Sequence, residues 1–161
     1  MLSTQDFIRL FTLENDLILS QTAGLSQADT FIQPQPSGNC MHWVLGHILQ
    51  NQISLLGVLG GVSPVDAAPL AIYKTGSDPI TSDRPGLLQL EHLRADISAV
   101  NTAINNRLAE MSDDDFSQEI EFNGRKSTLA WRFLFLQFHY STHVGQLEQL
   151  RQLAGHNDKI V

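Results

Sequence analysis

The sequence contains a single cysteine, Cys40, which excludes a fold held together by internal disulfides. Disulfides are the usual support of small secreted domains, and one thiol cannot form one within the chain. The opening residues MLSTQDFIRL show neither a basic segment followed by an apolar one nor a small-residue cleavage site, so we expect no export signal. Together these features predict a cytoplasmic protein.

Basic residues and long apolar runs are also scarce. Ten Lys and Arg stand against seventeen Asp and Glu, and no basic cluster lines up on one face, so we expect no nucleic-acid partner. No apolar run reaches the roughly 20 residues that span a bilayer, so we expect no membrane segment. The length of 161 residues suits one hydrophobic core, which predicts a single domain over residues 1–161.

Helical periodicity dominates the first third of the chain. Apolar residues recur near every 3.6 positions from a cap at Ser3 or Thr4 as far as Gly24, which predicts a first amphipathic helix. A second helix is predicted to begin at residues 37–39 and to end at the glycine pair 60–61. Its apolar arc is wide, so we expect it to be the most buried helix.

The middle of the chain predicts a long connection and a third helix. Residues 62–82 contain several prolines and no sustained period, and long loops of this kind often form lids or interfaces. The third helix is predicted to start with Asp83 as its cap and Pro85 in its first turn. Its buried seam follows a heptad spacing through Leu90, Leu93, Ile97, Val100, Ile104, Leu108 and Met111.

A hairpin and a last helix complete the pattern. The pair Asn123-Gly124 lies between short extended runs, which is a strong local signal for a two-stranded turn. A fourth helix is predicted from about Ser127 to Ala154, and Gly155 stops it. The sequence therefore predicts an all-α fold: a four-helix bundle with a long connection between helices two and three and a small hairpin before the last helix.

Two of the six histidines, His139 and His143, lie four residues apart in the predicted last helix. This spacing stacks two side chains on one face, near enough for both imidazoles to bind one ion at about 2.0 to 2.1 Å. His143 lies on the core-facing stripe. The alternative is that the pair only packs in the core or lies on a solvated surface, and the spacing does not decide between them.

A third ligand is predicted at His47, in the middle of the apolar arc of the second helix. Burial there leaves the imidazole nitrogens in need of a partner, and bundles build metal sites from inward-facing side chains of different helices. His42 is five residues earlier and points away from His47, His92 lies on the polar side of the third helix, and His156 follows the final glycine. For these three we expect solvent exposure or a local hydrogen bond.

Three imidazoles around a divalent ion leave coordination positions open, as in catalytic metal sites. Zinc is the first choice from ligand preference, and nickel or iron also accept imidazole ligands. The sequence assigns no catalytic residue and no cofactor-binding residue beyond the three metal ligands.

Two segments carry a resemblance to a known family. The run NCMHWVLGH, from Asn39 to His47, is similar to the second-helix signature of the DinB-like (also called YfiT-like) superfamily of metal-dependent four-helix-bundle proteins. The run HYSTHVGQL, which begins at His139, resembles that superfamily's C-terminal HxxxHxGQ helix. The similarity covers essentially the whole chain, including the long second connection and the hairpin.

The resemblance implies that His47, His139 and His143 bind one divalent ion. Characterised branches include S-transferases that use low-molecular-weight thiols such as bacillithiol or mycothiol, and a thiol-dependent maleylpyruvate isomerase. A metal lowers the pKa of a coordinated thiol and so presents the nucleophilic thiolate, which fits that chemistry. Some thiol-using relatives replace the first histidine of the pair by glutamate or carry an extra C-terminal domain, and this chain has neither feature.

Three hypotheses follow for the function. The first is a metal-dependent S-transferase that directs a low-molecular-weight thiol at an electrophilic small molecule. The second is a metal-dependent small-molecule hydrolase that activates water. The third is a non-enzymatic, stress-related metal-binding module.

Several other residues could serve such a site. Cys40 ranks below His47 as a ligand, and we expect it to be buried. The side chains that could orient or enclose a substrate are Tyr140, Gln146, Asn51, Gln50, Trp43 and Trp131. For each of them, packing or surface polarity is an equally good explanation.

The low share of charged residues, 17%, also bears on assembly. A bundle this poor in charge leaves apolar helix surface exposed, so we expect a homodimer that covers it.

Overall fold

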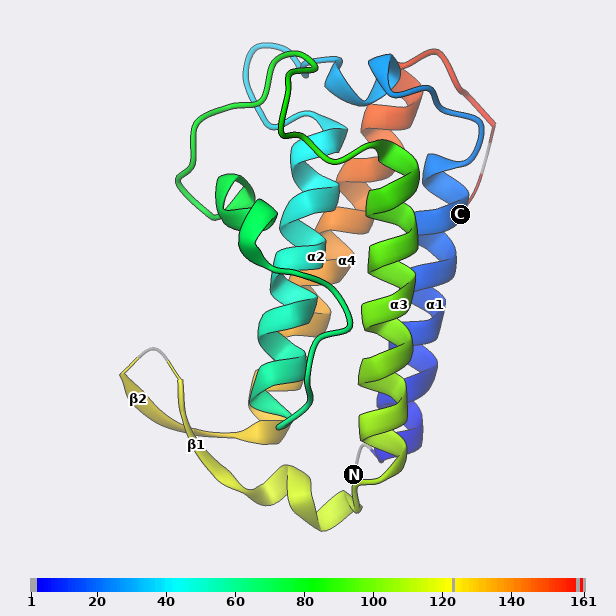
Figure 1. The fold of residues 1–161 in the computed structure, drawn as a ribbon. Helices are drawn as coiled ribbons and strands as arrows, with labels where there is room; N and C mark the ends of the chain where they lie inside the picture. Colours follow the sequence, from blue (N-terminus) through cyan, green and yellow to red (C-terminus); the bar gives the residue numbers. More distant parts are fainter. Residues whose placement is uncertain (1–2, 123, 159, 161) are drawn as a thin grey trace.

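The computed structural model describes residues 3–122, 124–158 and 160, and it shows four long helices with a small hairpin (Figure 1). Short 3-10 helices lie in the connections. The elements in chain order are α1 (Thr4–Thr22), η1 (Ala28–Phe31), α2 (Met41–Val58), η2 (Ala68–Tyr73), α3 (Leu90–Ala109), η3 (Asp113–Ser117), β1 (Glu119–Phe122), β2 (Arg125–Thr128) and α4 (Leu129–Leu153). The predicted all-α bundle with a hairpin before the last helix is confirmed.

The four helices form a ring in which α3 and α4 each pack against both α1 and α2. Neighbours α1 and α3 are antiparallel, and the Asn101 side chain of α3 donates a hydrogen bond of 2.8 Å to the Phe11 carbonyl of α1. Neighbours α2 and α3 are parallel: the last turn of α3 reaches the end of α2, where Arg107 Nε donates to the Leu59 carbonyl at 2.8 Å.

The parallel pair explains the long connection. The 18 residues of α2 rise about 27 Å, so the chain must travel back by that length before α3 can start. Residues 59–89 make this journey, and Figure 1 shows them climbing along the outer side of α2. The connection therefore covers one face of α2 as a consequence of the topology.

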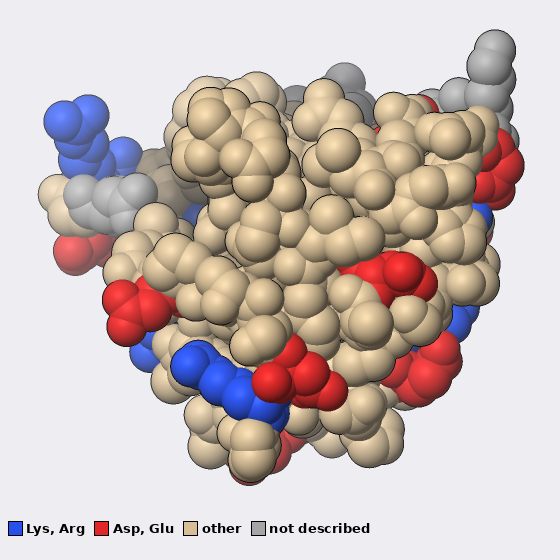
Figure 2. All heavy atoms as spheres, turned by 90° about the horizontal axis from the view of Figure 1, so that it is seen from above, with Lys and Arg blue, Asp and Glu red and all other residues tan. Residues whose placement is uncertain are grey.

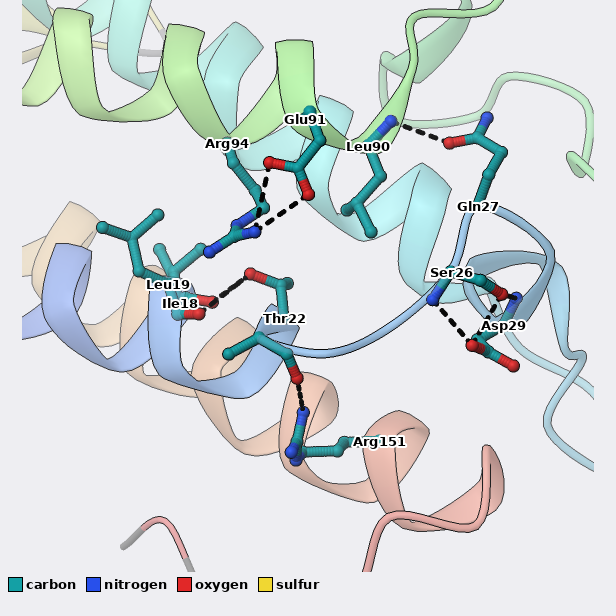
Figure 3. Close-up of polar contacts among 11 residues, drawn as sticks. Ile18, Leu19, Thr22, Ser26, Gln27, Asp29, Leu90, Glu91, Arg94 and Arg151 are labelled. Carbon is teal, nitrogen blue, oxygen red and sulfur yellow. Dashed lines mark hydrogen bonds and ion pairs between the residues drawn. The ribbon is translucent and has the colours of Figure 1, made fainter.

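The predicted start of the third helix was wrong. Asp83 and Pro85 lie in the connection, and Gly86 takes a positive φ of 92°, which interrupts a right-handed helix. The helix begins at Leu90, whose N–H donates to the side-chain oxygen of Gln27 at 2.7 Å (Figure 3). This cap comes from a distant segment, so no local sequence pattern could reveal it.

The other predicted elements lie within a few residues of their observed positions. Ser3 caps α1 in a capping box with Asp6, and the Thr128 hydroxyl caps α4 by accepting from the Trp131 N–H. Helix α2 begins later than predicted, at Met41. The hairpin strands pair antiparallel from Glu119 opposite Thr128 to Phe122 opposite Arg125, while Asn123 falls outside the described residues.

The core follows the predicted stripes, with the α3 seam buried from Leu90 to Leu108.

None of the described helices combines the length and apolar character needed to cross a bilayer. Figure 2 shows the end of the bundle at which α3 begins, where the Lys and Arg side chains drawn there are scattered among acidic and uncharged groups.

One carboxyl group is buried in this core. Glu14 of α1 is 5% exposed, and one of its oxygens accepts a hydrogen bond of 2.7 Å from Gln137 of α4. The other oxygen has no partner among the described residues. Burial raises the pKa of Glu14 to about 8, so the folded protein holds it protonated at neutral pH.

We expect Glu14→Gln to remove a pH-dependent loss of stability. The unfolded chain loses the Glu14 proton near its usual pKa of 4.5 and the folded chain only near 8, so raising the pH across this window destabilises the folded state. Relative to the variant, the wild type should lose on the order of 3 kcal/mol in unfolding free energy between about pH 5 and pH 8. Urea unfolding followed by circular dichroism measures the difference. The exposed Asp16→Asn is the matched control on α1, and a pH-independent difference for Glu14→Gln would contradict the assignment.

A close packing contact holds the long connection on α2. A Cβ at Gly46 would lie 2.3 Å from ring atoms of Tyr73, which is fully buried in η2. Only glycine allows the connection to approach this closely. A Cβ added at Gly57, on the same helix, would have no described atom within 4 Å beyond the helix's own nearby backbone.

We expect Gly46→Ala to destabilise the protein by about 1 to 3 kcal/mol, because overpacking forces side chains and backbone to shift. Gly57→Ala should be neutral or stabilising by up to about 1 kcal/mol, since alanine favours the helix. Thermal unfolding of the two variants separates these outcomes. Equal melting temperatures would show that Tyr73 does not pack on Gly46.

Candidate metal centre

The three predicted histidines lie together between α2 and α4. His47 Nε2 is 3.2 Å from His139 Nε2, which is 3.0 Å from His143 Nε2. One ligand atom from each residue lies within 4.8 Å of the others. Imidazoles bound to zinc at about 2.0 to 2.1 Å need separations of this size.

The opposite ring nitrogens fix how two of these imidazoles are oriented. His47 Nδ1–H donates to the Tyr73 carbonyl at 2.8 Å, and His143 Nδ1–H donates to Gln146 Oε1 at 2.8 Å. A neutral imidazole carries one proton, so both residues present an unprotonated Nε2 to the common point. Partners of this kind are typical behind metal-bound histidines.

This donor set fits a cation. His139 Nε2 can carry one proton and donate it to only one of its two unprotonated neighbours, while the Asn51 amide can donate to His47 Nε2 at 3.1 Å. A divalent ion at the centre would satisfy all three. Protons are a poor substitute, because burial lowers the pKa of His47 and His139 and takes that of His143 to about 4.

Aromatic and amide side chains surround the His47 imidazole. Trp43 stacks on it with ring centroids 4.7 Å apart, and the indole N–H donates to the Ser77 hydroxyl at 2.9 Å. The Asn51 amide donates to the His47 carbonyl at 2.8 Å and lies 3.1 Å from His47 Nε2. His47 is therefore held from one side by the long connection and from another by its own helix. His139 is only partly buried, so a ligand would approach beside it.

The other three histidines do not join this cluster. His42 differs from the prediction, because it is fully buried and bonded to a distant segment: its Nε2 lies 2.8 Å from the Leu88 carbonyl. Its ring stacks on Phe31, and its bond to Leu88 ties the end of the connection to α2. His92 is exposed and His156 is partly buried near the C-terminus.

Cys40 is buried as predicted. Its thiol donates to the Ile80 carbonyl at 3.0 Å, and burial raises its pKa. It is therefore a protonated packing group and is absent from the histidine cluster.

The residues considered for substrate contacts separate into two groups. Asn51, Gln146 and Trp43 contact the histidines directly. The Tyr140 ring packs edge-on against Phe11 deep in the core, away from the bundle surface. Gln50 is partly exposed on α2, and Trp131 is exposed at the start of α4.

Sequence reasoning missed Tyr73, which orients His47. Its contribution is a backbone carbonyl at the end of the short helix η2, and any residue type can supply one. The one sequence feature linked to this contact is Gly46, because any larger residue there would collide with the Tyr73 ring.

Comparisons with known proteins agree with this architecture. A DinB-like protein from Bacillus cereus ATCC 10987, known from its crystal structure, has the same fold with a TM-score of 0.71 at 20% identity, over 95% of this chain and 93% of that chain. A search of curated proteins found no match. The sequence profile described as DinB superfamily matches residues 11–147, which is most of the chain. The chain belongs to the DinB superfamily.

Proposed function

We propose that the protein binds one divalent metal ion through His47, His139 and His143, with zinc as the first choice and nickel or iron as alternatives. The supporting observation is the convergence of three Nε2 atoms, two of which are fixed without a proton. An unprotonated imidazole nitrogen is a metal-binding group, and imidazole is a preferred ligand of all three metals.

We further propose an S-transferase activity toward an electrophilic small molecule. A bound divalent ion lowers the pKa of a coordinated low-molecular-weight thiol, which makes it nucleophilic. The Asn51 amide lies at the histidine nitrogens and can orient a ligand, while Trp43 closes one side against water. A cytoplasmic location belongs to this proposal, because thiols stay reduced there.

A hydrolase is the second candidate, and one observation makes it the weaker one. Metal-dependent hydrolases commonly place a carboxylate near the metal as general base, as in the HExxH helix. In the described part of the chain, the groups that contact the three histidines are amides, backbone carbonyls and aromatic rings, with no carboxylate. A non-enzymatic metal-binding module is the outcome if neither activity is found.

The metal proposal predicts one zinc per chain in tag-free protein after dialysis, measured by elemental analysis. His47→Ala and His143→Ala should each lose the ion. Gln146→Ala should weaken zinc binding by about 10- to 100-fold, the usual cost of removing a hydrogen-bond partner behind a ligand. His92→Ala, an exposed histidine on α3, is the control and should bind normally.

Substoichiometric zinc in the wild type, or equal zinc in His143→Ala and His92→Ala, would refute the site. Zinc should also raise the melting temperature of the wild type and leave that of His143→Ala unchanged, since a ligand stabilises only the state that binds it. With metal-loaded protein, thiol conjugation to a generic electrophile supports the transferase, and thiol-independent ester turnover supports the hydrolase.

We propose a homodimer through the outer face of α4. This face carries the exposed apolar side chains of Phe138, at 71% exposure, and Leu134. A strip of uncharged residues continues it to Gly145, where no described atom lies within 4 Å of an added Cβ. A face without charges can pack on its own copy about a two-fold axis, with no like charges brought together.

Light scattering at micromolar concentration should therefore report a dimer. Phe138→Glu should give a monomer with unchanged helical circular dichroism, because it places two carboxylates in an apolar interface. Val62→Glu, at a 90% exposed position in the connection, is the control and should remain dimeric. A monomeric wild type would refute the proposal.

A further inference from the structure

A hollow of about 460 Å³ lies between the hairpin and the first turns of α4. Its walls combine aromatic rings with cationic side chains, a lining that the proposed metal centre does not use. The residues around it are Phe122, Arg125, Lys126, Ser127, Trp131 and Phe135.

The alternation of the hairpin separates its charges. Phe122 pairs with Arg125 across the strands, so both side chains lie on one face of the hairpin. On that face the Phe122 ring packs against Phe135 of α4, with ring centroids 5.4 Å apart. Glu121 pairs with Lys126 on the opposite face, where Lys126 also reaches Glu119 at 3.7 Å. The face toward α4 thus carries an arginine, and both hairpin carboxylates point away from it.

A second guanidinium comes from α4 itself. Arg132 is half-buried and lies over the Phe122 ring, 4.1 Å from the centroid. Within residues 3–122, 124–158 and 160, neither Arg125 nor Arg132 has a carboxylate within ion-pair distance. In a chain of net charge -7, one arginine over the Phe122 ring and a second paired with Phe122 across the strands, neither with an ion pair among the described residues, are unexpected.

This cluster is continuous with the metal centre. The Phe135 ring is nearly parallel to the His139 imidazole, at 9° and with centroids 6.5 Å apart. Arg132 precedes His139 by seven residues, two helical turns, so both lie on the same side of α4. Burial and His47 lower the pKa of His139, and the nearby Arg132 charge lowers it further.

We propose that Arg125 and Arg132 form an anion subsite that binds the carboxylate of an organic acid. The acid's apolar body lies against Phe122 and Phe135, and its far end points to the histidine cluster. Guanidinium groups pair with planar carboxylates through two parallel hydrogen bonds, and aromatic walls select a ligand with apolar surface. This inference rests on the proposed function and narrows its substrate class to carboxylate-bearing electrophiles.

Two tryptophans allow a direct test, because Trp131 borders the subsite and Trp43 stacks on His47 at the metal centre. Their indole N–H signals in a nitrogen-15 NMR spectrum report the two places separately. Benzoate is titrated into full-length, metal-free protein, with benzamide as its uncharged counterpart. Benzoate should shift the Trp131 signal saturably, and benzamide should not.

Arg125→Ala and Arg132→Ala should each weaken benzoate binding at least tenfold, while Arg84→Ala, an exposed arginine of the connection, should leave it unchanged. Arg132→Lys keeps the charge and the packing but not the paired hydrogen bonds, so it tests the subsite even if Arg132→Ala unfolds. We expect Arg132→Lys to bind benzoate more weakly than the wild type. In the wild type with zinc added, benzoate should also shift the Trp43 signal.

Equal binding of benzamide, unchanged affinity in both arginine variants, or displacement of benzoate by equimolar inorganic phosphate would overturn the carboxylate subsite. These results are independent of the metal. Benzoate binding to His143→Ala with no zinc uptake would keep the subsite and refute the metal centre. Stoichiometric zinc without benzoate binding would support the metal centre and refute the carboxylate subsite.

Discussion

The packing of α2 on α4 brings three imidazole nitrogens within 4.8 Å of one another, two of them fixed without a proton, and the candidate metal centre depends on this contact. The His47 and His143 rings are buried, and burial lowers the pKa of all three imidazoles, so their protonation is disfavoured. Two of the histidines belong to α4 and the third to α2, so the packing of these two helices sets the separation of the three nitrogens.

The topology supplies the orientation of His47. Because α2 and α3 are parallel, residues 59–89 must run back along α2, and this brings the Tyr73 carbonyl to His47 Nδ1. Gly46 allows Tyr73 to pack closely on α2, and the Ser77 hydroxyl of the same connection accepts a hydrogen bond from the Trp43 indole N–H. The connection therefore orients the His47 imidazole as well as joining two helices. The hairpin before α4 has a second role as well, since it brings Phe122 against Phe135 and under the Arg132 guanidinium of α4.

The sequence predicted features that depend on local periodicity. The four helices and the placement of His143 on a buried stripe follow from repeat spacing, and the hairpin follows from the turn signal Asn123-Gly124. Features that depend on distant partners were missed or misplaced. Helix α3 starts at Leu90 because Gln27 caps it, and His42 is buried because Leu88 and Tyr73 pass over it. Backbone carbonyls leave no trace in residue identity, so the Tyr73 contact required the structure.

X-ray absorption at the zinc edge, on tag-free protein loaded with one equivalent of zinc, tests the metal centre most directly. The account predicts a first shell at about 2.0 to 2.1 Å with the multiple-scattering pattern of three imidazoles. His143→Ala should lose that pattern. An oxygen-only shell in the wild type, with no imidazole scattering, would contradict a site built from His47, His139 and His143.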